Sequence, residues 1–158
     1  MPLRSLFFFC LPGVVSLLLH GCNLPLQHQK HLTRKFKRAG VREFSFQTEK
    51  DTIHYFEGGS GDTVLLVHGF GGDAAITWDK TLKDLSKDFY VIAPDLLWFG
   101  KSNSSRQPNL NAQVTALTAL LDSRRINRYH VAGISYGGFV SLGLFYSQPE
   151  RIKSLCII

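Results

Sequence analysis

The sequence predicts an α/β fold in which helices cover a mostly parallel sheet. Three observations predict it: short apolar runs without alternation, amphipathic segments between them, and glycine-rich turns after two of the runs. A strand covered on both faces is apolar throughout, whereas a half-exposed strand alternates. The 158 residues are ordinarily globular in composition, with 44% hydrophobic and 19% charged residues. After the apolar start described below, this length allows one domain.

The expected strands and helices alternate along the chain as such a sheet requires. Residues 43–48 and 52–56 alternate at period two, which predicts antiparallel edge strands joined around 49–51. Helices are expected where apolar side chains recur at helical spacing. The remaining expected elements are the strand 63–67, the helix 76–87, the strand 89–93, the helix 111–125, the strand 129–132, the helix 138–146 and a strand that begins at 154.

A G-x-S-x-G motif, from Gly133 to Gly137 with Ser135 at its centre, lies between an expected strand and an expected helix. Strand, sharp turn and helix form the context in which this motif presents a nucleophile. The glycines remove side chains that would clash where the backbone reverses, so the serine is left strained and exposed. The motif predicts a nucleophile elbow, and the alternative is a glycine-rich helix start with a capping serine.

A second glycine-rich turn, HGFGGD, covers residues 68–73 directly after the strand 63–67. Glycines at the carboxyl end of a buried parallel strand let the backbone approach a ligand and present bare N–H groups. Such groups can stabilise the oxyanion of a tetrahedral acyl intermediate. The alternative is a simple strand-to-helix loop.

Three motifs in order, HGFG from His68, PDLLWFGKS from Pro94 and GISYGG from Gly133, resemble those of the α/β-hydrolase superfamily. The resemblance covers residues 43–158 and implies the amino-terminal part of an α/β-hydrolase fold. It implies Ser135 as the nucleophile and the backbone N–H groups of Phe70 and Tyr136 as the oxyanion hole. His68 would then organise its loop and not act as the base. The residues that it implies as loop support are His68, Gly69, Gly71, Gly133 and Gly137.

The middle motif departs from the D-x-x-G-x-G-x-S pattern of the family at Trp98, where glycine is usual. A large indole there would line or cap the substrate pocket, with Phe70 and Tyr136 at an apolar mouth. We expect Asp95 and Ser102 to hold this loop through hydrogen bonds to backbone groups, and not to act in catalysis.

The resemblance also implies an acid and then a histidine after the nucleophile. Only 23 residues follow Ser135; none is His or Asp, and Glu150 is expected at a solvated helix end. His54 and His130 fall in expected strands, and His28 and His31 in a polar stretch. Because a serine without a positioned base is a poor nucleophile, we expect the amino-terminal half of an enzyme, either as an incomplete sequence or as a truncated gene product. The 158 residues alone are then expected to have negligible turnover and an exposed, aggregation-prone strand edge.

Residues 1–21 predict a secretory signal peptide. A single basic residue, Arg4, precedes a largely apolar run over residues 5–19, which is shorter than the roughly 20 residues of a membrane-spanning helix. The run ends in LHGC, which resembles a bacterial lipobox and implies cleavage before Cys22 and lipidation of its thiol. The alternatives are an ordinary cleaved signal and an uncleaved anchor. Each predicts an exported protein, either a membrane-associated lipoprotein or a periplasmic or secreted one.

Residues 22–42 are polar and basic and predict a tether between this leader and the hydrolase core at 43–158. Much of the net charge of +6 is concentrated here, which favours contact with anionic lipid headgroups. A solvated linker is the alternative. Nucleic acid is not expected as a partner of an exported chain. The basic residues are Lys30, Arg34, Lys35, Lys37, Arg38 and Arg42.

Cysteine usage predicts no disulfide pair. Cys10 lies in the leader, Cys22 at the processing site and Cys156 in an expected buried strand. The sequence has no metal-ligand cluster, and its glycine loops lack the lysine and spacing of a P-loop. We therefore expect neither a metal nor a cofactor.

The predicted function is hydrolysis of a carboxylic ester, of a lipid or another small acyl substrate, through an acyl-enzyme on Ser135. Alternatives on the same fold are a C–C bond hydrolase, a thioesterase, an amidase and a haloperoxidase. A non-catalytic, membrane-attached binding protein is an alternative of a different class.

Overall fold

The computed structural model describes residues 24–158, with side chains from residue 31 onward, so the predicted signal peptide and Cys22 lie outside the described residues. The strands are β1 (Arg42–Gln47), β2 (Asp51–Gly58), β3 (Thr63–Val67), β4 (Tyr90–Pro94), β5 (Asn103–Ser104), β6 (Tyr129–Gly133) and β7 (Ile152–Ile157). The helices are α2 (Leu24–Arg38), α3 (Ala74–Thr77), α4 (Asp79–Leu85), α5 (Leu110–Ser123) and α6 (Tyr136–Ser147), with a 3-10 turn η1 (Pro149–Arg151).

In this part of the chain the strands form one sheet in the order β1-β2-β4-β3-β6-β7, with β5 on β2. The run β4-β3-β6-β7 is parallel, whereas β1 and β2 are antiparallel as predicted. Because β3, β4 and β6 are parallel neighbours, their carboxyl ends meet at one edge of the sheet. The three sequence motifs follow these ends, so the topology gathers them at that edge.

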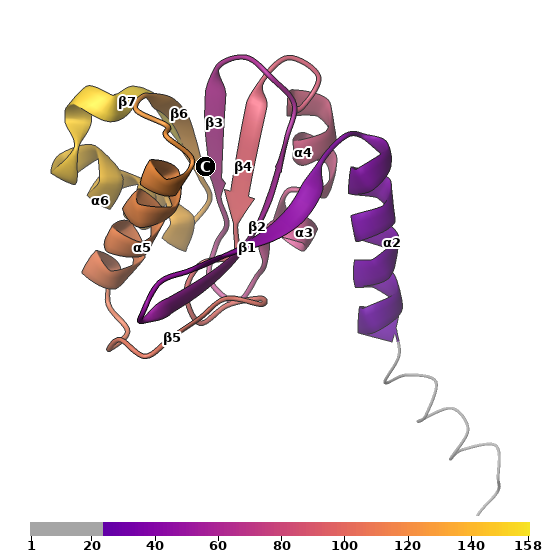
Figure 1. The fold of residues 1–158 in the computed structure, drawn as a ribbon, viewed down its shortest axis with the longest axis horizontal. Helices are drawn as coiled ribbons and strands as arrows, with labels where there is room; N and C mark the ends of the chain where they lie inside the picture. Colours follow the sequence, from indigo (N-terminus) through magenta and orange to yellow (C-terminus); the bar gives the residue numbers. More distant parts are fainter. Residues whose placement is uncertain (1–23) are drawn as a thin grey trace, which may run out of the picture.

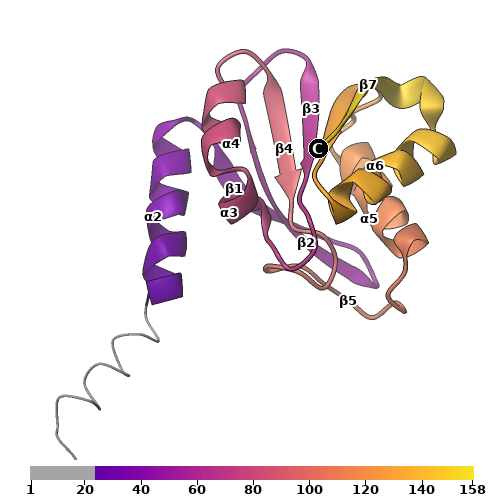
Figure 2. The same cartoon turned by 180° about the vertical axis from the view of Figure 1, so that it is seen from behind.

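Strand β3 is buried on both faces, as its unbroken apolar run predicts. Leu65 and Val67 belong to one hydrophobic cluster, which includes α5 and α6. Val64 and Leu66 belong to a second cluster, which includes α2, α3 and α4. The alternation of side chains along a strand therefore divides the core into two layers, and the helices cover opposite faces of the sheet (Figures 1 and 2).

The described part of the expected tether differs from a solvated linker. Residues 24–38 form α2, and its side chains Leu32 and Phe36 are 1% and 0% exposed. Phe36 meets the ring of Phe56 edge to face, with centroids 5.2 Å apart. Two apolar side chains one turn apart are enough to pack this basic segment on the domain. Within residues 24–158 no helix combines the length and the apolarity needed to cross a membrane.

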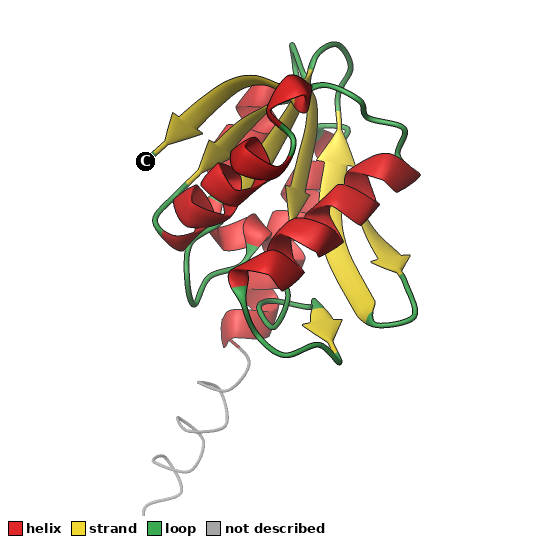
Figure 3. Ribbon diagram, turned by 90° about the vertical axis from the view of Figure 1, so that its left-hand side faces the viewer, coloured by secondary structure: helices red, strands yellow, loops and turns green. Residues whose placement is uncertain are grey.

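Two further details correct the sequence-based expectations. The single helix expected over 76–87 is broken into α3 and α4 at Trp78, which leaves helical geometry at φ −111°, ψ 19° and buries its indole. Cys156 is exposed and not buried, because β7 is the outermost of the strands within residues 24–158 (Figure 3). The other expected strands and helices are present close to their predicted bounds.

Candidate active site

Ser135 stands at the turn between β6 and α6. Its side chain is exposed, and its backbone is strained at φ 52°, ψ −118°. A non-glycine residue in such a region costs on the order of 1–3 kcal/mol and persists only where the surroundings impose it. The surroundings here are backbone hydrogen bonds on both sides, from Ile134 N to Val67 O (3.1 Å) and from Ser135 N to Ile158 O (2.9 Å).

The glycines of the motif allow the close packing that this turn requires. A Cβ on Gly133 would lie 2.3 Å from the Gly137 carbonyl oxygen, and one on Gly137 would lie 2.3 Å from that of Val67. Both contacts are with backbone, which cannot move aside without shifting β3 or α6. Side chains at these positions would therefore separate the helix from the sheet and displace Ser135.

The glycine-rich loop after β3 lies against the serine. A Cβ on Gly69 would be 3.4 Å from the Cβ of Ser135, and the ring of Phe70 meets that of Tyr136 at 6.2 Å. Tyr136 is the first residue of α6, so its N–H has no partner inside the helix. The amino end of this helix also favours negative charge. The carboxyl edge of the sheet therefore combines the exposed hydroxyl of Ser135 with the amino end of α6, which is suited to an anion.

His68 connects the glycine-rich loop after β3 to the loop after β4 through hydrogen bonds. It is fully buried; Leu96 N–H donates to its Nε2 (2.9 Å) and its Nδ1 lies 2.7 Å from the Gly69 carbonyl oxygen. Since Nε2 accepts, the proton is on Nδ1 and the ring is neutral. Burial lowers the pKa of His68 below its ordinary value, which keeps it so. Both ring nitrogens are occupied, so His68 has no free lone pair with which to act as a base.

Asp95 has the structural role expected of it. Its buried carboxylate accepts hydrogen bonds from Ala74 N–H (2.8 Å), Lys101 N–H (2.9 Å) and His54 Nδ1 (2.9 Å). Burial alone would raise the pKa of Asp95, but these three hydrogen bonds outweigh it and the pKa lies below its ordinary value. Ser102 donates to the Asp95 carbonyl oxygen (2.7 Å) and accepts from His54 N–H (2.9 Å), so it too holds the loop.

An aromatic pocket of about 410 Å³ adjoins the glycine-rich loop. Trp98 enters it with a left-handed backbone, φ 69°, the conformation that the usual glycine adopts easily. Trp98, Phe70 and Tyr136, which were expected at a pocket mouth, all line this pocket. The pocket is lined by Phe70, Trp98, Phe99, Pro108, Asn109, Gln113 and Tyr136.

Four of these residues were not expected from the sequence: Phe99, Pro108, Asn109 and Gln113. Phe99 meets the rings of Phe70 (5.1 Å) and His68 (5.8 Å) edge to face. Gln113 is buried in α5, where it accepts from Leu97 N–H (2.9 Å) and donates to the Leu97 carbonyl oxygen (3.1 Å). A polar residue beside the apolar stripe of a helix was the available signal for Gln113.

Neither His54 nor His130 lies close enough to Ser135 to act as its base. His54 is on β2, and β4 and β3 separate β2 from β6; at about 4.8 Å per strand this is roughly 14 Å. His130 lies near the start of β6, roughly 16 Å before Ser135 along the strand. There it contacts Ser154 Oγ (2.7 Å) and, less closely, Asp62 (3.6 Å) at the opposite edge of the sheet.

Comparison with known proteins shows which family this chain resembles in sequence. Residues 62–158 match the model of a family described as alpha/beta hydrolase fold. Lipase 1 of Psychrobacter immobilis is 30% identical over 161 aligned residues, which cover 94% of this chain and 50% of the lipase. The 2-hydroxymuconate semialdehyde hydrolase of Pseudomonas sp. (strain CF600) is 29% identical over 136 residues, 84% of this chain and 44% of that protein.

A solved structure is also similar to this chain. The crystal structure of a membrane phospholipase A, a bacterial virulence factor, matches with a TM-score of 0.72 and 29% identity, over 92% of this chain and 49% of that one. The chain thus spans half or less of the length of each of these relatives.

Proposed function

Because the chain belongs to the alpha/beta hydrolase family, we propose that it is part of a serine hydrolase that cleaves a carboxylic ester of a lipid or another small acyl substrate. The observation that carries the proposal is the packing of the glycine-rich loop against a strained, exposed Ser135. Similarity to Lipase 1 supports ester cleavage. Similarity to the 2-hydroxymuconate semialdehyde hydrolase supports a C–C bond hydrolase on the same serine as the second candidate.

The proposed reaction uses the chain's own groups as follows. Ser135 Oγ attacks the ester carbonyl carbon, and the N–H groups of Phe70 and Tyr136 donate to the oxyanion that forms. The C–O bond to the alcohol then breaks, the alcohol leaves with a proton, and an acyl-enzyme remains on Ser135. Water hydrolyses this ester and regenerates the serine. The base and its acid would come from the half of the fold that the relatives have beyond this region.

The aromatic pocket supports an apolar acyl group. Trp98, Phe99 and Phe70 give it walls that cannot hydrogen-bond to a polar chain, apart from the indole N–H, which already donates to the Ser104 carbonyl oxygen (3.3 Å). Its position beside the loop of the proposed oxyanion hole would place such an acyl chain next to the carbonyl that Ser135 attacks.

A fluorophosphonate probe tests the proposal, since it labels activated serines. We expect the protein expressed from the complete reading frame to be labelled, and Ser135→Ala to abolish the labelling. Ser154→Ala is the matched control, because Ser154 also contacts a histidine but lies at the opposite sheet edge. Residues 1–158 alone should be labelled weakly, because neither His54 nor His130 lies close enough to serve Ser135. Labelling that survives Ser135→Ala, or that is lost in Ser154→Ala, would contradict the assignment.

We further propose that the protein is exported and attached to a membrane through a lipid on Cys22. The apolar run before LHGC supports this attachment. In cells fed radiolabelled fatty acid, the parent chain should incorporate label and Cys22→Ser should not. A parent chain without label would exclude the lipid anchor.

A further inference from the structure

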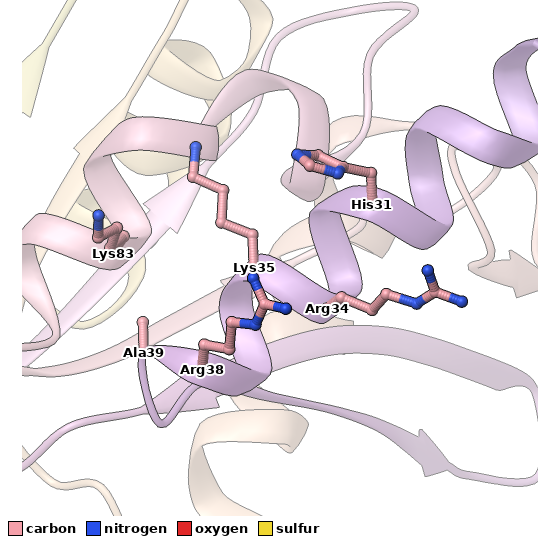
Figure 4. A pocket seen from close by; sticks show the side chains of 6 residues that line it. All are labelled: His31, Arg34, Lys35, Arg38, Ala39 and Lys83. Atoms are coloured by element: carbon pink, nitrogen blue, oxygen red, sulfur yellow. The ribbon is translucent and has the colours of Figure 1, made fainter.

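We propose that a basic groove between α2 and α4 binds the phosphate of an anionic phospholipid headgroup. The groove has a volume of about 480 Å³, and Figure 4 shows that most of its side chains come from α2 and one from α4. It is lined by His31, Arg34, Lys35, Arg38, Ala39 and Lys83. This inference rests on the proposed membrane attachment at Cys22, which would bring a bilayer near the groove, and it is independent of the hydrolase chemistry.

The packing of α2 fixes which of its faces points outward. Leu32 and Phe36 are buried against the domain, one turn apart. His31, Arg34 and Arg38 recur at spacings of three and four, so they form a row on a different, exposed face. Lys83 on α4 is exposed beside this row. The cations are therefore held in place by the fold and are not a feature of a disordered tail.

The charge in the groove is only partly balanced by the protein. Lys35 pairs with Asp79 at 2.5 Å, and the nearby Asp84 pairs with Lys87 at 2.8 Å. Among the described residues, no carboxylate forms a salt bridge with Arg34, Arg38 or Lys83. Arg34 and Arg38 are one turn apart, an arrangement of like charges that weakens a helix unless an anion lies between them. The sequence of α2 itself contains no acidic residue.

Phosphate is the anion that fits this set best. Two guanidinium groups can each donate two parallel hydrogen bonds to phosphate oxygens, and an ammonium group adds a compact charge. A lipid source is favoured by position, because α2 begins two residues after Cys22. Arg34 lies ten residues further along this helix, roughly 15 Å at 1.5 Å per residue. A bilayer that holds residue 22 would thus lie within reach of the groove.

Vesicle sedimentation tests the proposal on the full chain carrying Cys22→Ser, so that no attached lipid contributes. Binding is measured to vesicles of equal parts phosphatidylglycerol and phosphatidylcholine, and separately to vesicles of phosphatidylcholine alone. The quantity compared between variants is the first binding constant divided by the second. The groove variant combines Arg34→Gln, Arg38→Gln and Lys83→Gln. The control combines Arg42→Gln, Lys50→Gln and Arg128→Gln, three exposed cations outside the groove. Each triple variant removes three cations and so lowers the formal net charge of +6 by the same amount.

The groove variant should lower the ratio about 100-fold, at the usual contribution of each cation near an anionic surface, and the control much less. A third variant, Arg34→Lys with Arg38→Lys, keeps the charge but removes the paired guanidinium donors, so its binding should lie between those of the parent and the groove variant. Equal losses in both triple variants would overturn the proposal, because net charge alone would then explain binding. It would equally be overturned if inorganic phosphate displaced the chain from vesicles no better than chloride at equal ionic strength, because the groove would then not recognise phosphate. A groove variant that lost only binding to a single-stranded oligonucleotide would assign the groove to nucleic acid instead.

Discussion

Replacing Ser135 by alanine is expected to lower kcat/KM of the complete protein on an ester by roughly 10⁴- to 10⁶-fold, the range seen when a catalytic nucleophile is removed. Ser135→Gly should lose as much activity but should also raise the free energy of unfolding relative to Ser135→Ala. Alanine keeps a Cβ at φ 52°, whereas glycine adopts this conformation without strain. Part of this stabilisation is offset, because a glycine gains more chain entropy on unfolding than an alanine. We therefore expect the free energies of unfolding of the two variants to differ by about 1 kcal/mol.

Hydrolysis of a short-chain 4-nitrophenyl ester and urea unfolding measure the two effects on the same samples. Ser154→Ala again serves as the control, with parental activity expected. If Ser135→Ala kept parental kcat/KM, Ser135 would not be the nucleophile. If Ser135→Gly were no more stable than Ser135→Ala, the turn would hold no strain, and its geometry would not be a device for presenting the hydroxyl.

The parts of the site that could be predicted from the sequence are those fixed by local chemistry. The run 63–67 is apolar without alternation, and only a strand covered on both faces requires this. The elbow could be located because two glycines flank a serine between a strand and a helix, and sterics allow few other residues there. The hydrogen-bonding role of Asp95 was expected from the resemblance of its loop to the middle motif of the family.

The parts that could not be predicted depend on contacts between distant segments. Residues 24–38 contain many cations, and nothing local shows that Leu32 and Phe36 pack beneath the domain. The helix break at Trp78 arises because its indole is buried in the core cluster of α2, α3 and α4. The sequence showed an indole in place of glycine at Trp98, but not that its backbone would keep the left-handed conformation.

Replacing Asp95 by alanine is expected to lower the free energy of unfolding by about 3–5 kcal/mol, the usual cost of removing one partner from a buried charged network. Three donors, Ala74 N–H, Lys101 N–H and His54 Nδ1, would lose their acceptor in the interior. The carboxylate also packs closely against Gly100, where a Cβ would lie 2.3 Å from Asp95 Oδ2. Urea unfolding at neutral pH measures the loss.

The same carboxylate predicts how stability depends on pH. Because the folded pKa of Asp95 is lowered from its ordinary value of 3.8, its contribution is complete above the unfolded pKa and is lost as pH falls through the folded pKa. The difference between the parent and Asp95→Asn, which keeps the size of the side chain but not its charge, should therefore be largest near neutral pH and shrink below about pH 4. Asp84→Ala, which removes an exposed partner of Lys87, should change stability little at any pH. An Asp95→Asn difference that stayed constant into acid would show that packing, and not the charge of Asp95, stabilises the loop that carries Trp98 and Phe99 into the pocket.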